Sequence, residues 1–110
     1  MSTIPVNSVA SVLKLNVSNE ETAVKFDKAM EGLHKKMKAH PGYDHCVRHV
    51  CKSEWAYEIS FVFGTPASFG EWKTCAIRDD VHSDYLKALE ECGIKEDDVY
   101  GGARVHDVWK

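Results

Sequence analysis

Side chains that could move a proton or hold a ring system recur along this chain. The stretch SFGEWKTCAIRDDVH ends in a histidine, His82, ten residues after Trp72. Because histidine titrates near neutral pH, His82 could act as a general base, hydrogen-bond a ligand or bind a haem iron. It also precedes Tyr85 and Leu89 by three and seven residues, which predicts a place on the buried stripe of a helix. A purely structural role in the core therefore stays open.

A second group of polar side chains lies in HPGYDHCVRHVC. His45 and His49 are four residues apart, which would join two metal ligands on a helix but separates them by about 13 Å in a strand. Cys46 and Cys51 would face opposite sides of that strand. The spacing of zinc ligands is absent, so we expect no metal and interpret the four cysteines of the chain as reduced thiols. His45 and His49 are then strand residues beside a core or pocket.

Rings gather on one side of the predicted sheet. Strand alternation places aromatic and imidazole groups on that side, and residues of two later helices approach it. Each ring alone is most simply a core residue, but together they would suit a planar, apolar ligand. The predicted catalytic residues are His82, His49 and His45, and the predicted ligand contacts are Tyr57, Phe61, Phe63, Phe69, Trp72 and Tyr85.

The elements that must position these residues follow from periodicity and end signals. Alternating apolar residues predict strands over 11–17, 43–51, 55–63 and 103–109. A capping box from Ser18 to Glu21 predicts the start of a helix that ends near His40, before Pro41. A short helix should begin after Thr65, and a further helix should be capped by Asp79 and stopped by Gly93.

This order, β-α-β-β-α-(α)-β, predicts an α+β fold of the ferredoxin-like type, with helices on one face of a four-stranded antiparallel sheet. The opposite face should be uncovered. This face is too apolar to be exposed to solvent and too charged to be a closed core. We therefore expect a second copy to pack on it, so that the two chains form an α/β barrel. By alternation that face carries Val12, Lys14, Asn16, Cys46, Arg48, Val50, Glu58, Val62, Arg104, His106 and Val108.

Length and composition exclude several classes of protein. The 110 residues are 44% hydrophobic and 28% charged, as expected for a single globular domain over 1–110. A net charge of −3 gives no general electrostatic attraction to nucleic acid or to an anionic membrane. The N-terminus has no secretory pattern and no run of 18 apolar residues occurs, so we expect a cytoplasmic protein. The G-x-S-x-G elbow and glycine-rich phosphate loops are absent.

The motifs HPGY, YEISFVF and GTPASFGEW, followed by His82, together resemble the antibiotic biosynthesis monooxygenase family of dimeric α/β barrels. The resemblance covers about Val12 to Trp109 and rests on element order and a loose motif. It implies a pocket between sheet and helices and dimerisation through the sheets. It also implies a monooxygenase that needs no cofactor and acts on an aromatic or polyketide-like molecule. His82 would be its base, and Tyr57 and Trp72 would orient the substrate.

Other members leave three alternatives open: a polyketide cyclase, a haem-binding or haem-degrading protein, and a non-enzymatic ligand-binding or stress-related barrel. The haem-degrading branch is similar in the S-F-x-x-W segment and in a later histidine that binds iron, which would be His82. Its first-strand asparagine would correspond to Asn16. It has a tryptophan at the end of the third strand, where this chain has Phe63.

Overall fold

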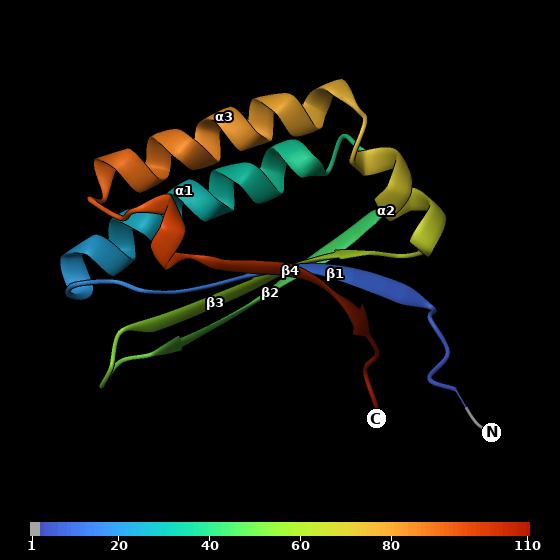
Figure 1. Cartoon of the computed structure of the whole chain (residues 1–110), viewed down its shortest axis with the longest axis horizontal. Helices are drawn as coiled ribbons and strands as arrows, with labels where there is room; N and C mark the ends of the chain where they lie inside the picture. The colour runs from blue at the N-terminus through green and yellow to red at the C-terminus, as the bar shows by residue number, and fades with distance from the viewer. Residues whose placement is uncertain (1–2) are drawn as a thin grey trace.

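The computed structural model describes residues 3–110, in which three helices cover one face of a four-stranded sheet (Figure 1). The strand order is β2-β3-β1-β4 and every neighbouring pair is antiparallel. The predicted ferredoxin-like α+β fold is confirmed. The elements are β1 Ser8–Asn16, α1 Glu20–Met37, β2 Tyr43–Cys51, β3 Ala56–Phe63, α2 Pro66–Trp72, α3 Ala76–Glu91, the short 3₁₀ helix η1 Glu96–Asp98 and β4 Tyr100–His106. Within residues 3–110 no helix is long and apolar enough to cross a membrane.

Helix α1 packs on the sheet through the predicted stripe. Apolar residues at steps of three and four are buried: Ala23, Phe26, Met30, Leu33 and Met37. The predicted capping box is wrong, because Asn19 caps this helix. Its Oδ1 accepts a hydrogen bond from the backbone N–H of Thr22 at 2.9 Å, while the hydroxyl of Ser18 lies 3.2 Å from that of Thr22. Serine and asparagine are both favourable N-cap residues, so the sequence alone could not show whether Ser18 or Asn19 caps the helix.

Helices α2 and α3 are separated by a break that lies four residues earlier than expected. The predicted start of α2 is confirmed, with Thr65 as N-cap and Pro66 in the first turn. Helix α3 begins at Ala76, directly after the N-cap Cys75, so the prediction that Asp79 caps it is wrong. Gly93, with a φ of +66°, follows the end of this helix as predicted. The earlier start brings Arg78 into the first turn.

A β-bulge in β2 exchanges the two faces of that strand. Tyr43 pairs with Phe63, but His45 pairs with Val62, so one extra residue lies between them. Each later residue therefore points to the face opposite to the one that simple alternation predicts. The facing predicted for His45 and His49 is wrong: both pair with outward-facing residues of β3, away from the helices. Cys46, Arg48 and Val50 lie opposite Phe61, Ile59 and Tyr57 on the helix-covered face.

Strand β4 begins earlier than predicted. Gly101 and Gly102 lie before the predicted strand over 103–109, but in the structure they pair with Leu13 and Val12 inside β4. The strand ends at His106, so Val108 and Trp109 lie beyond it, and Trp109 is 94% exposed. Gly101 pairs with Leu13 and so faces the helices, and its lack of a side chain leaves space between the sheet and α3, whereas Gly102 pairs with Val12 and faces the uncovered side.

The core between sheet and helices is aromatic around Phe63, which is completely buried. Four rings lie around it, with centroids 6.0, 5.6, 5.3 and 5.6 Å away, in His40, Tyr43, Phe69 and Trp72. His40 is also buried, and its Nε2–H donates to the carbonyl of Ser68 at 3.0 Å. Gly42 makes this corner possible, because its φ is +93° and a Cβ there would lie 2.3 Å from Cβ of Ser68.

Candidate functional site

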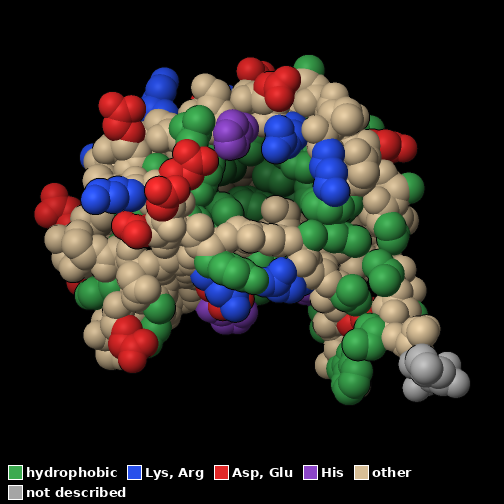
Figure 2. Space-filling model, in the orientation of Figure 1, with side chains coloured by type: hydrophobic (Ala, Val, Ile, Leu, Met, Phe, Trp, Pro, Cys, Tyr) green, Lys and Arg blue, Asp and Glu red, His purple; other side chains and the backbone are tan. Residues whose placement is uncertain are grey.

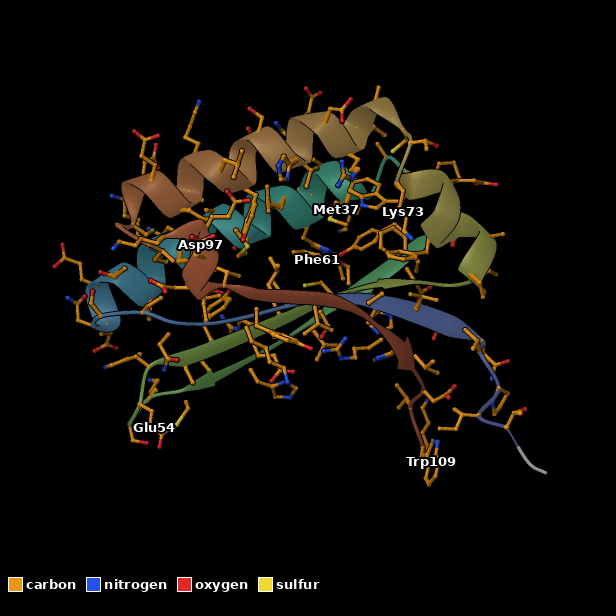
Figure 3. The ribbon with its side chains drawn as sticks, in the orientation of Figure 1. Met37, Glu54, Phe61, Lys73, Asp97 and Trp109 are labelled. Atoms are coloured by element: carbon orange, nitrogen blue, oxygen red, sulfur yellow. The ribbon has the colours of Figure 1, made fainter. Side chains whose placement is uncertain are left out.

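A groove of about 280 Å³ opens between α3 and the glycine part of β4. In the space-filling view it is a hollow with a hydrophobic floor, with histidine and basic side chains on its rim (Figure 2). Phe61 and Met37 lie in the layer between helices and sheet at this place (Figure 3). The lining residues come from all three helices and from β1, β3 and β4: Ser11, Leu13, Leu33, Met37, Phe61, Trp72, Arg78, Val81, His82, Tyr85, Gly101 and Gly102.

One face of α3 supplies the chemistry of the groove. Arg78 lies three and four residues before Val81 and His82, and these lie four and three residues before Tyr85, so the four residues share that face. Val81 is buried, Tyr85 is half-buried and His82 is exposed at the rim. The expectation that His82 belongs to the buried stripe is therefore wrong, because Val81 takes that position and His82 lies one residue further round the helix. An imidazole at the rim can exchange protons with solvent.

The polar groups of the groove differ in their charge. Burial, with a smaller effect of Glu96, raises the pKa of Tyr85, so its phenol keeps its proton and can donate a hydrogen bond at neutral pH. The His82 and Tyr85 rings lie 6.1 Å apart. Among residues 3–110 no carboxylate lies within 4 Å of Arg78, and its guanidinium has no hydrogen-bond partner there. A charged donor, a titratable ring and a phenol thus line one apolar space.

The structure brings together some of the predicted site residues and separates others. His82, Phe61, Trp72 and Tyr85 line the groove. Phe63 and Phe69 do not line it: Phe63 packs against the indole of Trp72, and the Phe69 ring lies tilted against Phe63. These two residues shape the wall without facing the groove.

Tyr57 belongs to a different part of the molecule. Its hydroxyl donates to Oδ1 of Asp27 at 2.5 Å, and Oδ2 of Asp27 accepts from Nη1 of Arg48, also at 2.5 Å. Burial and the neighbouring Asp27 carboxylate raise the pKa of Tyr57, so its phenol stays protonated. With its hydroxyl occupied by α1, Tyr57 is a satisfied core residue away from the groove.

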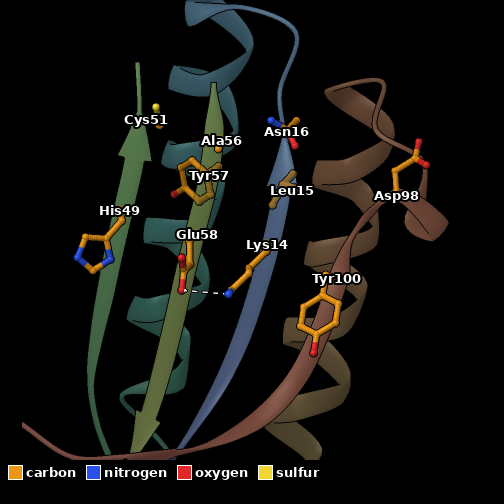
Figure 4. A pocket seen from close by; sticks show the side chains of 10 residues that line it. All are labelled: Lys14, Leu15, Asn16, His49, Cys51, Ala56, Tyr57, Glu58, Asp98 and Tyr100. Atoms are coloured by element: carbon orange, nitrogen blue, oxygen red, sulfur yellow. Dashed lines mark ion pairs between the residues drawn. The ribbon is translucent and has the colours of Figure 1, made fainter. Parts of the chain in front are cut away.

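His49 and His45 lie on the uncovered face of the sheet. His49 lines a hollow of about 430 Å³ there, near the ion pair of Lys14 with Glu58, whose atoms Nζ and Oε1 are 3.9 Å apart (Figure 4). The His45 ring lies 5.5 Å from the ring of His106 on the same face. A four-stranded sheet therefore stands between both imidazoles and the groove of His82.

Several residues that line the groove were not predicted from the sequence. Arg78 lies four residues before His82, so the helical spacing could have indicated it once the start of α3 was placed correctly. Gly101 and Gly102 carried a signal too, since glycine within a strand often marks a close approach or an open space. Nothing in the sequence indicated that Ser11 lines the groove, because its place in the alternation of β1 is that of a core residue.

The arrangement does not match the one that haem degradation would need. Asn16 lies on the uncovered face, where its amide donates to the carbonyl of Glu54 at 3.3 Å, and so it is remote from His82.

No protein-family model and no curated protein matches the sequence, whereas solved structures match its fold. A monooxygenase of Streptomyces coelicolor, from the gene ActVA-Orf6 and in complex with nanaomycin D, is 15% identical with a TM-score of 0.68, over 96% of this chain and 91% of that one. SnoaB, a cofactor-independent oxygenase from Streptomyces nogalater, is 10% identical with a TM-score of 0.65, over 94% and 96%. Further matching structures are candidate antibiotic biosynthesis monooxygenases. The chain has the fold of these monooxygenases.

The same fold occurs in proteins without an assigned activity. A dimeric ferredoxin-like protein of unknown function from a Jannaschia species is 12% identical with a TM-score of 0.61, over 88% of this chain and 97% of that one. At such identities the monooxygenase fold is shared without a shared reaction following from it. What this chain does must therefore be argued from its own groove.

Proposed function

We propose that this protein binds a planar aromatic or polyketide-like molecule in the groove and oxygenates it without a cofactor. The observation that carries the proposal is the position of His82, a proton acceptor at the rim of an apolar groove walled by Phe61 and Trp72. The resemblance of the fold to SnoaB, a cofactor-independent oxygenase, supports the same reading. At about 280 Å³ the groove lies near the lower end of the usual range for small-molecule sites, which favours a ligand of two or three fused rings.

The reaction needs only the substrate, oxygen and a base. His82 removes a proton from a ring methylene beside a carbonyl, and the resulting enolate gives its electrons to O₂, which bonds to that carbon as a peroxide. The returning proton forms a hydroperoxide. Loss of the remaining hydrogen on that carbon breaks the O–O bond, leaving a ring carbonyl and water. The substrate supplies all four electrons, one oxygen atom enters the product, and the other leaves as water with both hydrogens.

The groove residues divide these tasks. His82 holds the proton between the two transfers, as a general base and then a general acid. The faces of Phe61 and Trp72 bind the ring system, and the Tyr85 phenol donates a hydrogen bond to a ring oxygen. Buried apolar neighbours, among them Leu33, keep water from the enolate while it reacts with oxygen.

Filling the groove should abolish this activity. A Cβ on Gly101 would lie 3.7 Å from Cδ2 of Leu13, an ordinary contact, so Gly101→Leu should fold while its side chain occupies the groove. With anthrone as the probe substrate, we expect oxygen uptake and anthraquinone formation by the wild type and their loss in this variant. The measurement is oxygen consumption together with absorbance, corrected for the uncatalysed reaction.

The matched control is Gly32→Leu, an exposed glycine of α1 with open space around its Cα. It should keep the wild-type rate. A wild type that never exceeds the uncatalysed rate, or a Gly101→Leu variant as active as the control, would contradict oxygenation in this groove.

We also propose that the protein is a homodimer whose copies pack through the uncovered sheet face. That face holds a buried apolar cluster of Ala10, Val12 and Val62, surrounded by polar and charged groups. A second copy would pack over this cluster and the polar groups around it, as the dimeric state of the Jannaschia relative supports.

Introducing a charge beside this cluster should separate the copies. We expect sedimentation equilibrium to give about twice the 12.4 kDa chain mass for the wild type and the single-chain mass for Val47→Glu, which changes a half-buried residue opposite Ser60 on the same face. Lys87→Glu, which changes an exposed residue of α3 on the other side of the molecule, should remain a dimer. A wild type of single-chain mass at micromolar concentration argues against this interface.

A further inference from the structure

Arg78 is the arginine whose charge the fold leaves unused. The chain has two others, and both are engaged: Arg48 donates to Asp27, and Arg104 donates to the Tyr100 hydroxyl and to a backbone carbonyl. Within residues 3–110, Arg78 has no carboxylate within 4 Å and no hydrogen-bond acceptor, although Asp79 and Asp80 follow it directly. Its guanidinium is therefore free to bind a ligand group at the groove.

The surroundings of Arg78 make one end of the groove positive. His82 lies one turn further along α3, and Lys73 lies at the same end of the molecule, with its Nζ 4.8 Å from the centroid of the Phe69 ring (Figure 3). In Figure 2 basic side chains stand on one side of the histidine at the rim and acidic ones on its other side, while, of residues 3–110, those that line the groove include Arg78 and no carboxylate. On a chain of net charge −3, this local reversal of sign favours an anionic group at that end.

We propose that the ligand is an aromatic carboxylic acid whose carboxylate pairs with Arg78. The inference rests on the proposed function and names the substrate class for that site. A carboxylate suits a guanidinium because the two planar groups can form parallel, charge-assisted hydrogen bonds. The apolar floor around Phe61 receives the ring body. Arg78 is then a positioning residue that determines specificity.

The spacing on α3 connects this contact with the chemistry. Residues four apart on a helix have Cβ atoms about 6 Å from one another, so Arg78 and His82 present their side chains to neighbouring parts of one ligand. A carboxylate held by Arg78 fixes the ring system along the groove and brings the adjacent ring carbons beside the His82 imidazole. Arg78 would thus hold the acid, and His82, one turn further along α3, would determine which carbon reacts.

The experiment compares two probes of nearly equal shape, 2-naphthoate and 2-naphthamide, by the quenching of tryptophan fluorescence. We expect the wild type to bind the carboxylate about tenfold more tightly than the amide, because a charge-assisted pair replaces a neutral contact. Arg78→Gln should remove this preference and keep the affinity for the amide, and Arg78→Lys should retain part of it. Lys87→Gln, an equal charge change on the same helix away from the groove, should behave as the wild type.

Each other outcome has a distinct meaning. Equal affinity of the wild type for the two probes overturns the inference but leaves the groove as a ligand site. Unchanged binding of both probes by Arg78→Gln also overturns it, because Arg78 then makes no contact that distinguishes the carboxylate from the amide. If neither probe binds, or if Gly101→Leu binds both as well as the wild type, the proposed site itself fails and the inference fails with it.

Discussion

Replacement of His82 by alanine should lower the rate of anthrone oxidation by a factor of about 10² to 10⁴, the usual contribution of a positioned general base. The imidazole is exposed at the groove rim, so its removal leaves no cavity in the core. The unfolding midpoint should therefore change little. Rates at several anthrone concentrations, with the urea midpoint of each variant, separate a lost base from a damaged fold.

The control for His82→Ala is His49→Ala, which removes an imidazole from the other face of the sheet. We expect the control to retain the wild-type rate, and exogenous imidazole to restore part of the activity of His82→Ala only. If the two variants lose activity equally, the assignment of the base to the groove is wrong. If His82→Ala unfolds at markedly lower urea, the residue has the structural role that the sequence left open.

Replacement of Phe63 by alanine should lower the free energy of unfolding by about 3 to 5 kcal/mol, the range for a fully buried phenylalanine. Its ring contacts the four rings that close this end of the core, so little of the space can collapse. Urea unfolding followed by circular dichroism measures the change. Trp72 loses its support in the same variant, so the affinity for 2-naphthamide should also fall.

Val24→Ala is the comparison for Phe63→Ala, since it truncates a half-exposed side chain on the outer part of α1. Its free energy of unfolding should stay within about 1 kcal/mol of the wild type. Similar losses in the two variants would contradict the view that the ring cluster around Phe63 carries much of the stability of the fold.

Period and burial explain which elements could be predicted from the sequence. Strands β1 and β3 are regular, so alternation assigned both faces correctly, and the stripe of α1 follows an uninterrupted helical period. Strand β2 was placed correctly but turned over, because the bulge after Tyr43 leaves no signal in a run of mixed polar and apolar residues. A bulge of one residue therefore made the predicted faces of β2 wrong although its bounds were predicted correctly.

The candidate site was predictable only in part, for a related reason. Trp72, Phe61 and Tyr85 came from the aromatic pattern, and His82 came from its spacing to Trp72. The mouth of the groove depends on the absence of a side chain at Gly101, a residue that the sequence analysis left outside the predicted strand 103–109. Residues that line a groove and residues that pack in the core recur with the same period in the sequence. Only the packing seen in the structure distinguishes them.

The bulge after Tyr43 also determines which groups of β2 the fold encloses. Because His45 pairs with Val62 directly after the bulge, deleting Asp44 would restore simple pairing and leave His45 and His49 on the uncovered face. A chain that keeps this residue but pairs it with Val62, without a bulge, would instead turn both imidazoles into the helix-covered layer and take Arg48 away from Asp27. Relatives of this length could thus differ in the reactive groups they enclose while their backbones still superimpose.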